Sequence, residues 1–126
     1  MAKTTKKDFE LFRREVERWL EIYGLKGWSV EILHKTYVEN SSASLFYRVG
    51  ARDAEYYLSK DFGKDKTELG VRLAAFHEVT HHLLGKLIHV AVERSHDEDM
   101  INAEEHEVIK TLQNTLFMAY ENDKLS

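Results

Sequence analysis

The hydrophobic positions between residues 8 and 23 recur every three or four residues, and Lys, Arg and Glu occupy most of the positions between them. The recurring residues are Phe9, Phe12, Val16, Trp19, Leu20 and Tyr23. This spacing places them on one face of an α-helix and leaves the opposite face polar. Gly24 and Gly27 follow, so we expect an amphipathic helix that ends near one of these glycines.

Three short segments rich in strand-forming side chains come next. They are residues 28–34, 43–49 and 54–59. The first begins with alternation that places three apolar side chains on its core face: Trp28, Val30 and Ile32. The other two are joined by Gly50-Ala51-Arg52-Asp53, a sequence that suits a hairpin turn. The pattern therefore predicts a small three-stranded sheet.

The rest of the chain has the pattern of two helices. The first extends from Lys66 or Thr67 to Leu87, is strongly apolar after Leu69 and should be largely buried. Thr67 is a residue type that caps such a helix. A polar connection at residues 93–99 precedes the second helix, expected over about residues 100–120. The predicted class is α+β, with an N-terminal helix, a small three-stranded sheet and two further helices.

Length and composition indicate one globular domain over residues 1–126. The chain is long enough to bury a core and too short for two ordinary domains. Its 43% hydrophobic and 32% charged residues are typical of globular proteins. Neither a signal-like apolar stretch near the N-terminus nor a segment of membrane-spanning length is present. We therefore expect a cytoplasmic protein without a membrane partner.

Charge and cysteine content limit the chemistry further. A formal net charge of -4 does not favour nucleic-acid binding, which usually depends on a basic domain or stripe. The chain has no cysteine, so it has no disulfide, no thiolate nucleophile and no sulfur ligand. Any metal ion must be bound through nitrogen and oxygen.

The first of the two later helices contains an H-E-x-x-H motif, in the stretch AFHEVTHHLL at residues 75–84. His77 and His81 are four residues apart, so on a helix they lie on one face and can direct nitrogen atoms to a common point. Glu78 lies one step around the helix, where its carboxylate can reach a water molecule on a metal ion. The motif predicts a zinc site with Glu78 as the general base.

A catalytic zinc ion needs a third protein ligand, and the candidates cluster in NAEEHE at residues 102–107. Helical phase ranks these candidates against one apolar face. That face comprises Ile101, Val108, Ile109, Leu112, Leu116 and Ala119. Glu105 falls at its centre, where a carboxylate is costly unless it is paired or bound to metal. Glu105 is therefore the preferred third ligand, and His106 and Glu104 remain alternatives.

These residues give the chain a resemblance to the zincin metallopeptidases, and in particular to the gluzincin arrangement. The match covers residues 74–112, and the order of predicted elements is similar to minimal ImmA/IrrE-like peptidases, SprT-like domains and small phage-encoded metallopeptidases. The resemblance implies a minimal zincin-like domain in which His77, His81 and Glu105 hold zinc and Glu78 is the catalytic base. It also implies that an edge strand binds an extended peptide, and residues 54–59 are the best candidate.

Two functional hypotheses of different class follow. The leading one is a zinc-dependent peptidase that hydrolyses a peptide bond in a peptide or protein substrate. The competing one is a non-catalytic zinc-binding protein with a regulatory or phage accessory role. Glu78 and the absence of cysteine favour the enzyme, because a structural zinc site needs no base and usually has four protein ligands, often cysteines. A metal-free helical interaction domain would leave the histidines and Glu105 unexplained.

Overall fold

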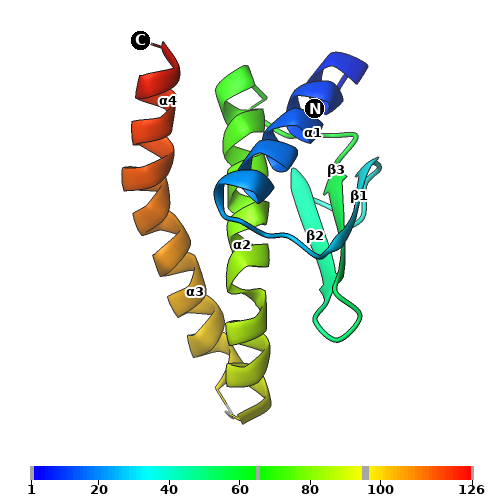
Figure 1. The fold of residues 1–126 in the computed structure, drawn as a ribbon. Coiled ribbons are helices and arrows are strands. Elements are labelled where there is room, and N and C mark those ends of the chain that lie inside the picture. Colours follow the sequence, from blue (N-terminus) through cyan, green and yellow to red (C-terminus); the bar gives the residue numbers. More distant parts are fainter. Residues whose placement is uncertain (1, 65, 95–96, 126) are drawn as a thin grey trace.

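The computed structural model describes residues 2–64, 66–94 and 97–125, and Figure 1 shows its elements in order. They are α1 (Lys6–Ile22), β1 (Ser29–His34), β2 (Ala43–Arg48), β3 (Asp53–Leu58), α2 (Glu68–Arg94), α3 (Glu98–Leu112), the π-helix η1 (Gln113–Phe117) and α4 (Met118–Leu125). The predicted α+β class with a small three-stranded sheet is confirmed. Of the predicted polar connection at 93–99, residues 95 and 96 lie outside the described residues.

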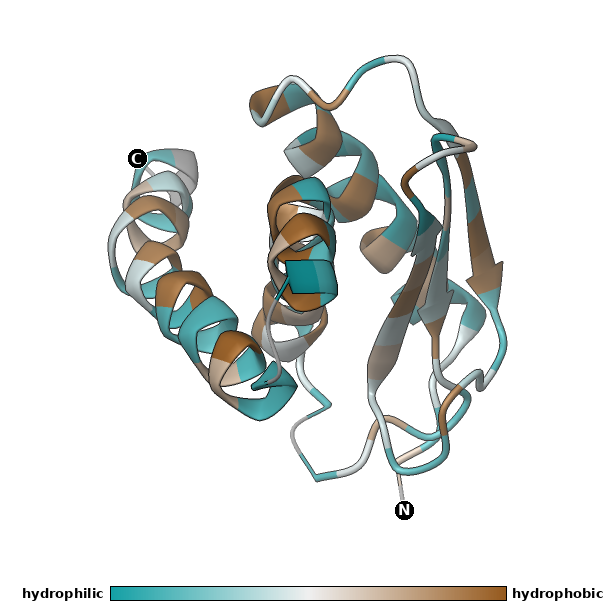
Figure 2. Cartoon of the chain, turned by 90° about the horizontal axis from the view of Figure 1, so that it is seen from below, coloured by the Kyte–Doolittle hydropathy of each residue, from teal (hydrophilic) through white to brown (hydrophobic). Residues whose placement is uncertain are grey.

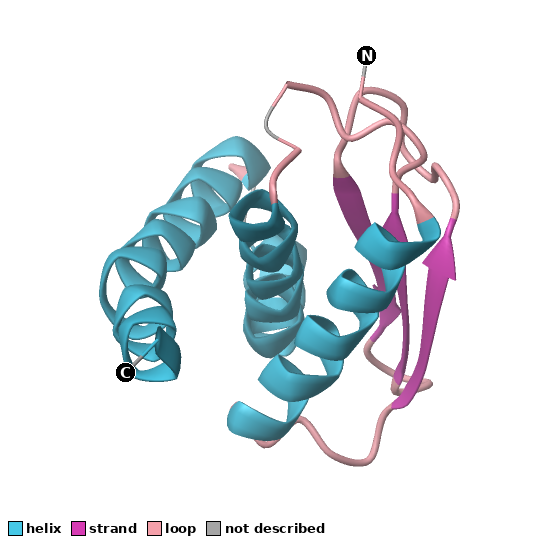
Figure 3. Cartoon of the chain, turned by 90° about the horizontal axis from the view of Figure 1, so that it is seen from above, coloured by secondary structure: helices cyan, strands magenta, loops and turns pink. Residues whose placement is uncertain are grey.

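Helix α2 lies at the centre of the fold. The sheet lies on one side of α2, the α3–η1–α4 segment on another, and α1 packs across its N-terminal half (Figures 1 and 3). The core is formed by apolar side chains from all these layers: Phe12, Val16, Trp19, Ala54, Tyr56, Leu58, Phe62, Val71, Ala75, Phe76, Val79 and Phe117. The predicted core face of the first strand is confirmed, since Trp28, Val30 and Ile32 pack against this cluster.

Helix α1 begins with a capping box. The backbone N–H of Asp8 donates to Thr5 Oγ1 at 3.1 Å, and the backbone N–H of Thr5 donates to the Asp8 carboxylate at 2.8 Å. Both bonds satisfy N–H groups that have no partner within the helix. At the other end, Gly24 adopts a φ of 68° just after Ile22, which confirms the predicted stop.

Removal of this cap is expected to destabilise the protein modestly. Thr5→Ala loses the side-chain acceptor of the box and should lower the free energy of unfolding by about 1 kcal/mol. The matched control is Thr111→Ala, because the Thr111 hydroxyl is exposed and donates to the Glu107 carbonyl within α3. Urea titration followed by circular dichroism measures both variants. Equal effects of the two substitutions would contradict a specific role for the cap.

The sheet is mixed. Strands β2 and β3 pair antiparallel as the predicted hairpin, which is confirmed, whereas β1 pairs parallel with β3. The strand order is therefore β1-β3-β2, with β3 in the middle. The prediction that residues 54–59 form the edge strand was wrong, because the parallel pairing with β1 covers the second side of β3. The edge strand of the hairpin is β2, and β2 also packs against α2.

Helix α2 is longer than predicted. Its first turn is capped as expected, with the backbone N–H of Gly70 donating to Thr67 Oγ1 at 2.9 Å. The helix continues to Arg94 instead of ending near Leu87. Within the described residues, no helix combines the length and apolar character needed to cross a membrane.

The C-terminal helical segment is interrupted by the π turn η1, which falls between α3 and α4. A π turn adds one residue relative to α-helical periodicity, so the face that follows it rotates by about 100°. Phe117 is consequently buried in the core, whereas Leu116 is 38% exposed and Ala119 is also exposed. The prediction that Leu116 and Ala119 continue the buried face was wrong for this reason.

Candidate metal centre

His77 and His81 lie on the same side of α2, as their spacing predicts. Their Nε2 atoms are 3.1 Å apart, and both side chains are half-buried. Two nitrogen ligands at the usual distance from a tetrahedral zinc ion are about 3.3 Å apart. The two histidines are therefore already spaced as a shared zinc ion requires.

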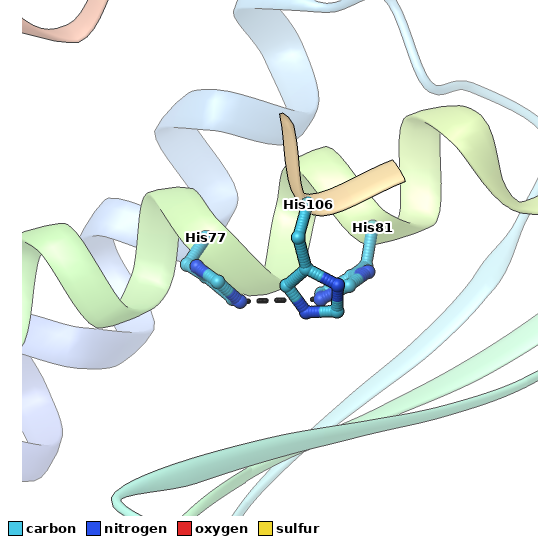
Figure 4. Close-up of side chains that lie close together, drawn as sticks. All are labelled: His77, His81 and His106. Carbon is cyan, nitrogen blue, oxygen red and sulfur yellow. Dashed lines mark hydrogen bonds between the residues drawn. The ribbon is translucent and has the colours of Figure 1, made fainter. Parts of the chain in front are cut away.

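His106 completes a group of three imidazoles. It extends from α3 toward the pair on α2 (Figure 4), and the candidate ligand atoms of the three side chains lie within 4.8 Å of one another. His106 Nδ1 donates to the backbone carbonyl of Asn102 at 2.8 Å, which leaves Nε2 with its lone pair available. Because His106 is exposed, side-chain rotation can shorten its distance to the pair.

Glu105 is buried beside this group, with 7% of its surface exposed. Its Oε2 atom lies 2.9 Å from Nδ1 of His81, so the ring N–H donates to the carboxylate. This bond holds His81 in the tautomer whose Nε2 lone pair faces His77, which is the usual role of a carboxylate behind a metal-binding histidine. Direct binding of the metal ion by Glu105 stays a prediction, and the group of three histidines is the alternative ligand set.

The donor set fits zinc. It consists of three imidazoles with an orienting carboxylate, and a chain without cysteine can offer zinc only nitrogen and oxygen. Burial, together with the neighbouring His81 and His106, lowers the pKa of His77 to about 4. The His77 imidazole is therefore neutral at pH 7, as metal binding requires.

Glu78 follows His77 on α2 and is half-buried. Burial, together with the negative charge of Glu105, raises the pKa of Glu78 to about 8. In the absence of a cation the carboxyl group thus tends to hold its proton at pH 7. A divalent ion bound by the adjacent histidines would reverse this preference, because it stabilises the carboxylate.

A cleft of about 390 Å³ opens beside His77 and Glu78. Ala43 at the start of β2, Phe62 and Gln113 also line it. Ala43 is the first residue of the edge strand β2, and Gln113 is the first residue of η1. A π turn beside the cleft agrees with the frequent occurrence of π turns at functional sites. The cleft can accept a side chain or a short chain segment next to the centre.

The packing of β2 against α2 depends on Gly85. A Cβ atom at this position would lie 2.8 Å from Cε2 of Tyr47, so the absence of a side chain allows the Tyr47 ring to lie against the helix. Gly85 is four residues after His81, on the same side of α2. The contact therefore holds the edge strand close to the centre.

The structure brings together most of the residues predicted from the sequence. His77 and Glu105 each contact His81, and Glu78 lines the adjacent cleft, whereas Glu104 is exposed. His106 was only an alternative ligand in the sequence analysis, because helical phase placed Glu105, and not His106, at the centre of the apolar face. Comparison of the chain with profiles of known protein families, with curated proteins and with solved structures finds no match.

Proposed function

We propose that this chain is a zinc-dependent peptidase. The observation that carries the proposal is that His77 and Glu78 line the same cleft, while His81 and His106 complete a group of potential ligands at its side. A structural zinc site would have no use for the half-buried acid Glu78 beside its ligands. A peptidase needs such an acid to remove a proton from the attacking water.

In this proposal His77, His81 and His106 hold the zinc ion, and Glu105 orients His81 through its bond to Nδ1. Bound zinc lowers the pKa of water and polarises a carbonyl group. Glu78 accepts the proton of the attacking water and then transfers it to the departing amine of the cleaved peptide bond. This transfer regenerates the carboxylate, and the proton leaves with the amine product.

The edge of β2 suits an extended peptide. Among the described strands, only β3 pairs with β2, so the other side of β2 offers backbone donors and acceptors. A substrate that adds to this edge would run past the cleft, because Ala43 is the first residue of β2 and also lines the cleft. We therefore propose that the substrate adds to the edge of β2, and not to residues 54–59 as the sequence predicted.

Zinc removal and return test the proposal. The zinc-loaded protein should cleave an unstructured protein such as casein, the chelated protein should not, and one equivalent of zinc should restore cleavage. Mass spectrometry of the fragments, with a mixed peptide library as a second substrate, measures this. One bound zinc ion without cleavage of any library peptide would refute the peptidase and support the non-catalytic zinc-binding alternative.

A further inference from the structure

The C-terminal half of α2 and residues 100–108 of α3 form an apolar groove of about 410 Å³. It is lined from α2 by Leu84, Leu87 and Ile88, and from α3 by Met100, Ile101 and Val108. Leu87 is 68% exposed, Met100 61% and Val108 44%. Figure 2 shows hydrophobic positions on both helices in this region. Such a continuous exposed apolar surface is typical of a site for another molecule.

The groove lies on the continuation of the face of α2 that α1 covers nearer the N-terminus of α2. Helix α1 packs over the N-terminal half of α2, and Tyr23, directly after the end of α1, is hydrogen-bonded through its hydroxyl to Thr80 Oγ1 of α2 at 2.9 Å. Beyond Thr80, the face carries Leu83 and Val90, which are 37% and 45% exposed. A helix placed beyond the end of α1 would cover these side chains as α1 covers the preceding ones.

Exposed charges around the groove are mainly negative. In residues 86–108, the exposed acidic side chains are Glu93, Asp97, Glu98, Asp99, Glu104 and Glu107. The exposed basic side chains of the same described segment are Lys86 and Arg94. Glu104 is itself part of the lining. A partner with basic residues beside its apolar face would complement this surface.

We infer that the groove binds an amphipathic helix of a partner protein, with an apolar face flanked by lysine or arginine residues. A second copy of this chain is disfavoured as the occupant because self-association would bring two acidic surroundings together. The same charges repel an anionic lipid surface. The inference does not depend on the peptidase proposal.

A partner bound in the groove would affect the metal centre through one residue, Glu105. Glu105 lines the groove and also accepts the hydrogen bond from His81 Nδ1. A partner helix would cover the remaining exposed surface of Glu105, and removal of water strengthens its interaction with His81. The partner is therefore expected to tighten zinc binding, in addition to docking.

The probe is a fluorescein-labelled helical peptide of about 14 residues, with Leu at positions i, i+3, i+4 and i+7 and Lys elsewhere. A peptide with Glu in place of Lys is its charge control. Fluorescence anisotropy measures binding to the wild type and to the double variant Leu87→Ser with Met100→Ser. Leu69→Ser is the matched control, because Leu69 is 49% exposed on the same helix, outside the groove. Circular dichroism verifies that each variant is folded.

Binding of the Leu/Lys peptide that falls about tenfold or more in the double variant, is unchanged in Leu69→Ser and is absent for the Leu/Glu peptide supports the inference. Equal binding to all variants, equal binding of both peptides or no binding would overturn it. Sedimentation velocity provides the remaining test: a wild-type dimer that the double variant disrupts identifies a second copy as the occupant and also overturns it. Zinc content is measured separately, so a result that contradicts peptide binding in the groove is distinguishable from one that contradicts the zinc site.

Discussion

Purified protein supplied with zinc is expected to retain one zinc ion per chain after desalting, and His81→Ala is expected to retain none. His81 connects the parts of the centre, because its Nε2 faces His77 at 3.1 Å and its Nδ1 donates to Glu105 at 2.9 Å. Its removal deletes a ligand and also the group that Glu105 orients. Elemental analysis, with a chromophoric chelator as competitor for the affinity, measures the outcome.

Two further variants identify the third ligand. If His106 is the ligand and Glu105 orients His81, His106→Ala loses stoichiometric zinc, whereas Glu105→Ala keeps it with about 10–100-fold weaker affinity. His89→Ala is the matched control, since His89 is an exposed histidine of α2 that pairs with Glu93. The control is expected to bind zinc like the wild type.

The reverse result has an equally clear meaning. Loss of zinc in Glu105→Ala with retention in His106→Ala would establish the ligand set predicted from the sequence and contradict the three-histidine set. Retention of zinc in His81→Ala would contradict both sets, because each depends on the pair on α2.

Local sequence patterns predicted the elements of this fold better than their arrangement. The periodicity of residues 8–23 and the hairpin turn at residues 50–53 depend on neighbours in the chain, and both predictions are confirmed. The central position of β3 depends on its pairing with β1, which no local pattern specifies.

The π turn shows a second limit of periodicity. The expected burial of Glu105 and Ile109 is confirmed, whereas Val108 of the same predicted face is 44% exposed. The rest of the predicted face is kept as far as Leu112. Beyond that residue, burial of Phe117 against Phe76, with ring centroids 5.1 Å apart, favours an extra residue in the turn. Aromatic packing in the core thus outweighs regular α-helical hydrogen bonding at this turn. A hydrophobic period of 3.6 residues assumes a regular α-helix and therefore cannot predict the π turn.

Sequence spacing was sufficient to pair His77 with His81, because both are on one helix. It was not sufficient to assign roles to Glu105 and His106, which are adjacent on a different helix. A rotation of about 100° separates the directions of their side chains, and the packing of α3 against α2 decides which one faces Nδ1 of His81 and which one faces the pair. That packing is a tertiary property.

Glu78→Gln is expected to abolish most peptidase activity and leave the zinc content unchanged. The amide has the size of the carboxyl group but cannot accept the proton of the attacking water, and general-base catalysis contributes about 10²–10⁴-fold to a rate. Glu78 lies beside His77 in the cleft, but the proposed ligands are the three histidines. Substitution of Glu78 therefore removes no proposed ligand. Initial rates of casein or peptide cleavage, together with elemental analysis of the same samples, measure both properties.

The control for this substitution is Glu104→Gln, which makes the same chemical change at an exposed glutamate of α3 outside the cleft. Its activity should equal that of the wild type. Because burial and Glu105 hold the pKa of Glu78 at about 8 in the absence of metal, the carboxylate needed for proton transfer is formed chiefly when a cation is bound. The base and the zinc site are therefore coupled. Zinc-loaded Glu78→Gln with wild-type activity would show that another group removes the proton and would contradict the role proposed for the H-E-x-x-H motif.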